Sequence, residues 1–216
     1  MPYWLQHTLS FSILFPVLVG ILRYRQLDAR YLPFLLLMWI GFANEQVSYV
    51  SGKLFRTNAP NSNLWFLAEA LLCLWCFYRW RLFRKPLVPC LIGGAYVLFW
   101  AMETFLLRSI LDFSVYFHIC YAFATVLMAI QYINKLIVTE QQLSIRHGDF
   151  TICTALVIFN TGAVFSECFW LYAFTENAKF GDSVFLITTF ANFFTNIMYG
   201  FALLWVPRRQ VYLQLS

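Results

Sequence analysis

Long apolar segments recur from one end of this chain to the other and leave only short polar connections between them. A helix needs about 20 apolar residues to cross the roughly 30 Å of hydrocarbon in a bilayer. Charged residues make up 12% of the chain, about half of what a soluble domain carries. The pattern predicts an all-α integral membrane protein. We expect a seven-transmembrane-helix bundle that forms a single domain over residues 1–216. The predicted spans lie near residues 5–22, 31–50, 64–83, 87–107, 114–136, 150–174 and 183–206.

The basic residues are distributed unequally between the two sides of this predicted bundle. One side has Arg23, Arg25, Arg30, Arg79, Arg81, Arg84, Lys85, Lys135, Arg146, Arg208 and Arg209, and the other has Lys53, Arg56, Arg108 and Lys179. Because cytoplasmic connections are enriched in Lys and Arg, the N-terminus is predicted outside and the C-terminus in the cytoplasm of a plasma membrane or bacterial inner membrane. Residues 1–7 have no basic leader, so we expect the first span to be retained.

The net charge of +5 follows from this topology and from attraction to anionic lipid. The predicted partners are therefore the lipid bilayer and, at the basic inner face, a cytoplasmic protein partner. A nucleic-acid partner is not expected.

Four glutamates lie inside four different predicted spans, at Glu45, Glu69, Glu103 and Glu167. Their distances from the span ends place all four roughly 6 to 10 Å below the outer edge of the membrane. A carboxylate in hydrocarbon costs at least about 2 kcal/mol, so a span that keeps one usually pairs, hydrates, protonates or uses it. The remaining acids, Asp149 among them, fall in predicted connections.

Other polar residues share this level and extend the predicted site. His118 lies at the same depth, and Asn192 and Asn196 follow on one face of the last span. We expect Glu69, Glu103, Glu167 and His118 to contact the ligand, Glu45 to complete the cluster, and the two asparagines to fix the orientation of the ligand. The inner halves of the spans are apolar, which predicts a polar cup open to the outside above an apolar floor.

A structural alternative exists for each glutamate, because a protonated side chain can hydrogen-bond to a neighbouring helix. The cysteines also favour a structural interpretation. All six lie inside predicted spans, where Cys73 and Cys76 are typical of packing residues, whereas Cys120 and Cys168 could pair if their helices touch.

The leading functional hypothesis is a receptor or sensor that binds a small polar or cationic ligand or a metal ion, since ionised glutamates attract positive charge. One alternative is an intramembrane metal-dependent hydrolase acting on a lipid or other amphiphile. In that case Glu69, Glu103, His118 and Glu167 would hold a divalent metal ion as the cofactor, although no catalytic residue is assigned.

Two seven-helix families resemble the chain in helix number. Hydrolases of the ceramidase and progestin-receptor type bind zinc through several histidines, whereas this chain has one embedded histidine. The second alternative function, a small-solute transporter, follows the resemblance to sugar transporters of the SWEET type, whose proline–glutamine signature is absent here.

Overall fold

The computed structural model describes residues 9–139, 147–173 and 178–207. Every regular element in these residues is helical, as predicted. The seven α-helices are α2 (Leu14–Arg23), α3 (Leu32–Phe55), α4 (Ala59–Arg79), α5 (Leu87–Ala101), α6 (Val115–Thr139), α7 (Gly148–Ala173) and α8 (Ala178–Trp205). Short 3₁₀ turns at η1 (Phe11–Ile13), η2 (Tyr24–Gln26) and η3 (Ala29–Tyr31) flank α2 and α3, and the π-helical segment η4 (Met102–Leu107) continues α5.

Four of these helices have the length and apolar character needed to cross a membrane. They are Leu87–Leu107, Val115–Thr139, Gly148–Phe169 and Leu186–Trp205. Helix α3 is long enough, but the run Asn44–Gln46 interrupts its apolar sequence, and α4 begins with the polar turn APNSN. The beginning of the first predicted span, together with Arg146, Arg208 and Arg209, lies outside the described residues.

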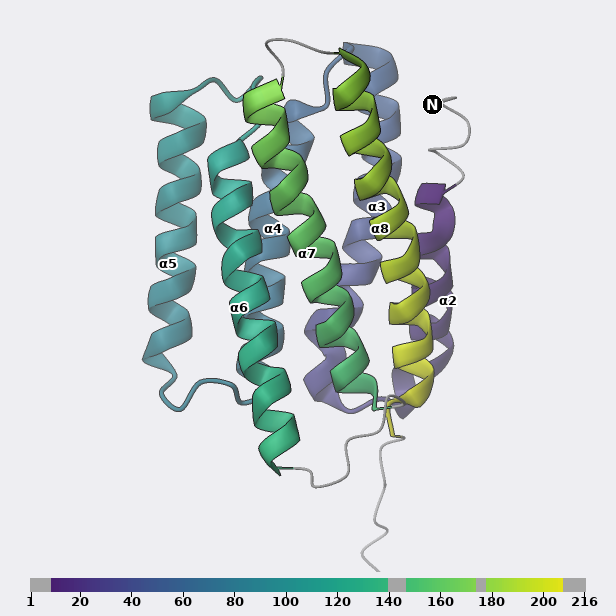
Figure 1. Ribbon diagram of the computed structural model, residues 1–216. Coiled ribbons are helices and arrows are strands. Elements are labelled where there is room, and N and C mark those ends of the chain that lie inside the picture. Colours follow the sequence, from purple (N-terminus) through teal and green to yellow (C-terminus); the bar gives the residue numbers. More distant parts are fainter. Residues whose placement is uncertain (1–8, 140–146, 174–177, 208–216) are drawn as a thin grey trace, which may run out of the picture.

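Six helices form a closed ring in the order α2, α3, α4, α6, α7 and α8, which returns to α2. Helix α5 lies outside the ring and packs against α4 and α6 (Figure 1). The connections between consecutive helices are short, which makes chain neighbours run antiparallel. Within the ring, α6 lies between α4 and α7 and contacts both.

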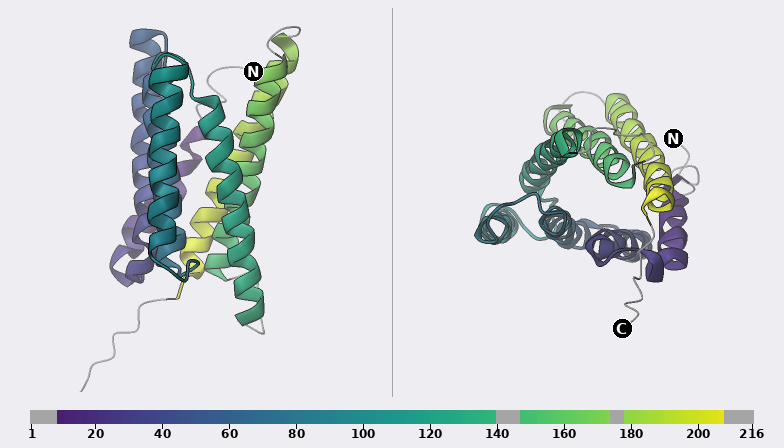
Figure 2. Two further views of the ribbon diagram at one scale, coloured as in Figure 1. Left: turned by 90° about the vertical axis from the view of Figure 1, so that its left-hand side faces the viewer. Right: turned by 90° about the horizontal axis from the view of Figure 1, so that it is seen from below.

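The two ends of the ring differ. The lower end in Figure 1, where α3 and α7 begin and α4 and α8 end, contains a group of bulky side chains that are at most 2% exposed: Tyr31, Phe34, Phe77, Ile152 and Leu203. Toward the upper end, α3 and α4 diverge from α7 and α8 (Figure 2, left).

Arg23 helps to hold the lower end of the ring together. It lies at the end of α2 and donates hydrogen bonds to the carbonyls of Leu203, Leu204 (2.7 Å) and Val206 (3.1 Å). The last carbonyls of a helix have no partner within that helix and carry partial negative charge. Arg23 therefore caps α8 and joins the first helix of the ring to the last.

Candidate functional site

Glu103 is fully buried, and its carboxylate is directed at the first turn of α6. Oε1 accepts the backbone N–H of Tyr116 (3.0 Å), and Oε2 accepts that of Phe117 (2.6 Å). The first amides of a helix have no partner within the helix and favour a negative charge nearby. Arg108 lies 4.0 Å from Oε1 and adds a cation on the exposed side. Glu103 is thus engaged as the cap of α6.

The connection between η4 and α6 is fixed by further polar contacts around this cap. The buried amide of Asn63 on α4 donates to the carbonyl of Asp112 (2.8 Å) and accepts the backbone N–H of Ser114 (2.9 Å). Thr104 and Ser114 share a hydrogen bond of 2.9 Å. Asn63 was not predicted as a site residue, although an asparagine near the beginning of an apolar helix is a typical partner for the backbone of a loop.

Two other glutamates meet α6 one turn lower. His118 and Tyr121 lie three residues apart on α6, so their side chains are neighbours on the helix surface. The His118 Nδ1 is 2.8 Å from Oε1 of Glu167 on α7, and the Tyr121 hydroxyl donates to Oε2 of Glu69 on α4 (2.8 Å). Three helices of the ring therefore contribute to one polar cluster, which we call the α6 cluster: Glu69, His118, Tyr121 and Glu167.

An aromatic wall borders the α6 cluster. Phe66 on α4 stacks on the imidazole of His118 with ring centroids 4.0 Å apart, and the ring of Tyr121 stacks on the same imidazole at 5.3 Å. Glu69 is 8% exposed, whereas the side chains of His118 and Glu167 are 12% and 22% exposed. The cluster is therefore buried at Glu69 and opens at Glu167.

The cluster contains more acidic than basic side chains. Its two carboxylates are matched by one imidazole, which can supply at most one positive charge. Tyr121 donates a hydrogen bond without supplying charge. A cation brought to Glu167 would therefore be attracted electrostatically, and the adjacent aromatic faces could stabilise it further.

The remaining predicted residues lie elsewhere around the ring. Asn196 on α8 donates to the hydroxyl of Ser12 beside α2 (3.0 Å) and to Oδ1 of Asn192 (3.3 Å). These contacts connect α8 to the N-terminal turn. Glu45 is partly buried on α3 and has no hydrogen-bond partner among the described residues.

Next to Glu45, Asn44 accepts a hydrogen bond of 2.8 Å from Asn61 on α4, and Asn61 also donates to Ser48 (2.9 Å). Asn44 thus joins α3 to α4. No functional role was predicted for this residue from the sequence.

In the described part of the chain, no three His, Cys, Asp or Glu side chains are close enough to hold a metal ion together. The four residues predicted as metal ligands, Glu69, Glu103, His118 and Glu167, are therefore not gathered into one ligand set. The cysteines are all free, and Cys120 and Cys168 do not form a disulfide.

A second polar network, absent from the sequence analysis, lies at the lower end of the ring. Asp149, 1% exposed in the first turn of α7, accepts hydrogen bonds from the hydroxyls of Tyr31 and of Tyr132 (3.0 Å). Arg30 lies 3.3 Å from Oδ2 of Asp149 and donates to the Tyr31 hydroxyl (2.6 Å). Asp149 was predicted in a solvated connection; it is buried because three polar partners compensate its lost hydration.

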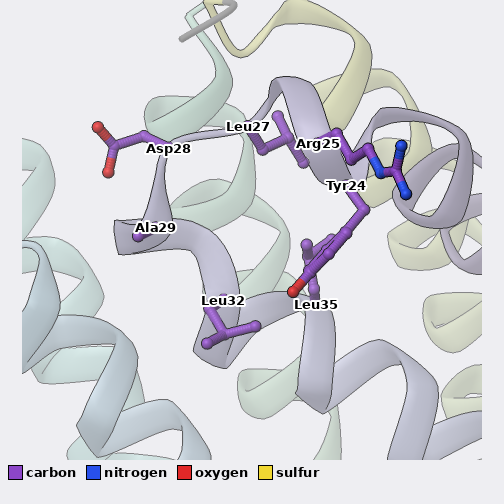
Figure 3. Close-up of a pocket in the computed structure, with 7 residues that line it drawn as sticks. All are labelled: Tyr24, Arg25, Leu27, Asp28, Ala29, Leu32 and Leu35. Atoms are coloured by element: carbon purple, nitrogen blue, oxygen red, sulfur yellow. The ribbon is translucent and has the colours of Figure 1, made fainter.

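A hollow of about 310 Å³ lies in the turn between α2 and α3 (Figure 3). Leu27, Leu32 and Leu35 contribute to its lining, and the side chains of Arg25 and Asp28 point in opposite directions. Since its polar groups do not converge, this hollow has no arrangement suited to a polar ligand.

The fold and the α6 cluster define a helical protein in which four helices can cross a membrane. In the cluster, α6 contacts one carboxylate of α7 through His118 and one carboxylate of α4 through Tyr121. The chain matches no protein-family model, no curated protein and no solved structure.

Proposed function

We propose that this chain is a seven-span receptor or sensor of a plasma membrane or bacterial inner membrane, and that its outward half binds a small organic cation. The observation that carries the proposal is the α6 cluster, where Glu69 and Glu167 approach His118 and Tyr121 from two different helices. A protonated amine fits this chemistry because it pairs with a carboxylate and packs against aromatic rings.

The distribution of charge supports the orientation. Of the described basic residues, the lower end has Arg23, Arg25, Arg30, Arg79, Arg81, Arg84, Lys85 and Lys135, whereas the upper end has Lys53, Arg56, Arg108 and Lys179. The lower end then faces the cytoplasm and the α6 cluster lies in the outward half. Helices α3 and α4, with 24 and 21 residues, are about 36 and 32 Å long, which is enough to cross the bilayer.

The packing of the ring favours binding over transport. Below the α6 cluster, Phe34, Phe77, Ile152 and Leu203 are at most 2% exposed and close the lower end with apolar side chains. A solute that enters from the outside would meet this floor. A metal-dependent hydrolase has less support than a cation receptor, because the described residues include no group of three metal-ligating side chains.

The proposal is tested with the full-length protein in detergent, by measuring its thermal unfolding in the presence of tetramethylammonium, methylammonium, Ca²⁺ or Mn²⁺. A ligand at about 100 times its Kd stabilises the folded state by about 2.7 kcal/mol. We expect a saturable rise in Tm with one or both organic cations. Glu167→Gln and Glu69→Gln should abolish this rise.

Asp112→Asn is the matched control, because it removes an exposed carboxylate from the connection before α6. This variant should respond to the cations as the wild type does. An equal response in wild type, Glu167→Gln and Asp112→Asn would contradict the proposal. A saturable response to Mn²⁺ alone would favour the metal-dependent alternative instead.

A further inference from the structure

A basic groove of about 780 Å³ lies at the lower end of the molecule, between the end of α4 and the turn that precedes α3. Four arginines line it, Arg30, Arg79, Arg81 and Arg84, together with the aromatic side chains of Tyr78 and Trp80. Asp28 contributes a carboxylate to the lining of the groove. Arginine guanidinium groups recognise phosphate through paired hydrogen bonds, and aromatic residues are typical of the membrane border.

The acids near the groove are already engaged by Arg30. The Asp28 carboxylate accepts the backbone N–H of Arg30 (2.8 Å) and caps η3, while the Arg30 guanidinium pairs with the buried Asp149 (3.3 Å). In the part of the chain that the structure describes, no carboxylate lies within 4 Å of the guanidinium nitrogens of Arg79, Arg81 or Arg84. These three exposed arginines leave a local excess of positive charge that favours an anion.

The backbone at Arg81 turns sharply after the end of α4. Arg81 has a φ of 58°, in the left-handed region where glycine is normally found after the end of a helix. The turn is held by hydrogen bonds from Trp80 N to Cys76 O (2.9 Å) and from Leu82 N to Phe77 O (3.0 Å). Lys135 on α6 also donates to the Arg81 carbonyl (2.6 Å).

An arginine in this conformation carries strain that a glycine would avoid. Unlike Arg56, which has the same backbone conformation, Arg81 lines the groove. Trp80 adds an unused donor. It is 3% exposed, and its indole Nε1 has no acceptor among the described residues.

The groove also lies where a lipid headgroup would be. The residues that follow Arg84 lead directly into the apolar helix that begins at Leu87, which can cross a membrane. We propose that this groove binds a phosphate group, presented by the headgroup of an anionic lipid or by a soluble phosphate compound. This site is separate from the α6 cluster, and the proposal does not depend on it.

Native mass spectrometry of the full-length protein in detergent tests this site, with phosphatidic acid, phosphatidylglycerol or phosphatidylcholine added. We expect retained phosphatidic acid and no retained phosphatidylcholine. Arg81→Gly should weaken retention about fivefold, the effect of one basic residue near an anionic surface. The fold should tolerate this change because glycine adopts the left-handed conformation readily.

Arg56→Gly is the matched control. Arg56 is also exposed and left-handed, with a φ of 57°, but it caps α3 at the opposite end of the molecule. The proposal is supported if retention of phosphatidic acid is unchanged in Arg56→Gly and weakened in Arg81→Gly. Equal retention of phosphatidic acid in both variants overturns it. Arg79→Gln provides a second variant for the case in which Arg81→Gly does not fold.

Addition of soluble pyrophosphate distinguishes the two sources of phosphate. If pyrophosphate displaces phosphatidic acid when both are present at the same concentration, the groove is assigned to a soluble phosphate compound. Retained phosphatidic acid assigns it to the lipid headgroup. Retention of phosphatidylcholine equal to that of phosphatidic acid overturns the proposal, because the zwitterionic lipid offers no net negative charge.

Discussion

Glu103 caps α6 with both of its carboxylate oxygens, so we predict that its main role is to stabilise the folded protein. Glu103→Gln should lower the free energy of unfolding by about 1–3 kcal/mol, because the glutamine presents an N–H₂ group to one of the two buried amides. The measurement is thermal unfolding in detergent. Glu45→Gln is the control and should change stability little, since Glu45 has no hydrogen-bond partner among the described residues. Equal losses in the two variants would contradict the cap.

The difference between these glutamates shows what the sequence could predict at the scale of residues. Position along a span gives the depth of a side chain but does not say which neighbour it contacts. The π-helical segment η4 adds to the difficulty, because its wider turn changes the direction of Glu103 relative to an α-helix. Tyr121 could have been predicted as a neighbour of His118 from the sequence, since it follows His118 by three residues. Phe66 carried no polar signal and could not have been singled out.

At the scale of elements, the packing of α2 against α8 depends on Gly200. A Cβ at this position would collide with the ring of Phe15, including Cγ, so that Phe15 would have to change its χ1 rotamer or α2 would have to move. Gly200→Ala should therefore destabilise the protein by about 1–3 kcal/mol. Gly94→Ala in α5 is the comparison, since a Cβ there meets no atom within 4 Å and should add about 0.5–1 kcal/mol of helix stability. Thermal unfolding of both variants checks the prediction, and a neutral Gly200→Ala would refute the close packing.

The Asp149 network also connects elements, because it joins η3, α6 and α7. Asp149→Asn should destabilise the protein by about 1–3 kcal/mol, since Asn offers one acceptor oxygen where the carboxylate offers two. Tyr132→Phe removes one of the same hydrogen bonds. In a double-mutant cycle the two changes should be non-additive by at least about 0.5 kcal/mol, and additive effects would show that the hydrogen bond contributes nothing. Asp112→Asn, at an exposed site, should change stability by less than about 0.5 kcal/mol.

At the scale of the whole molecule, apolar periodicity was sufficient to predict the number of described α-helices and their approximate positions, whereas ends such as that of α3 at Phe55 differ from the predicted spans by about five residues. Each described α-helix overlaps one predicted span because 20 or so apolar residues between polar turns have few alternatives to a helix. The closure of the ring was beyond the sequence, since it depends on side chains such as Arg23 contacting carbonyls 180 or more residues away. The exclusion of α5 from the ring likewise follows from packing.

The topology of the whole chain gives the last prediction. If α3 and α4 both cross the membrane, Arg56 lies outside the cell and Arg84 lies in the cytoplasm. In a background without the native cysteines, Arg56→Cys should react with a membrane-impermeant maleimide in intact cells. Arg84→Cys should react only after the cells have been permeabilised. If only the four most apolar helices crossed, α3 and α4 would stay on one side, and the two positions would show the same accessibility. Equal labelling would therefore refute the seven-span arrangement, and reversed labelling would refute its orientation.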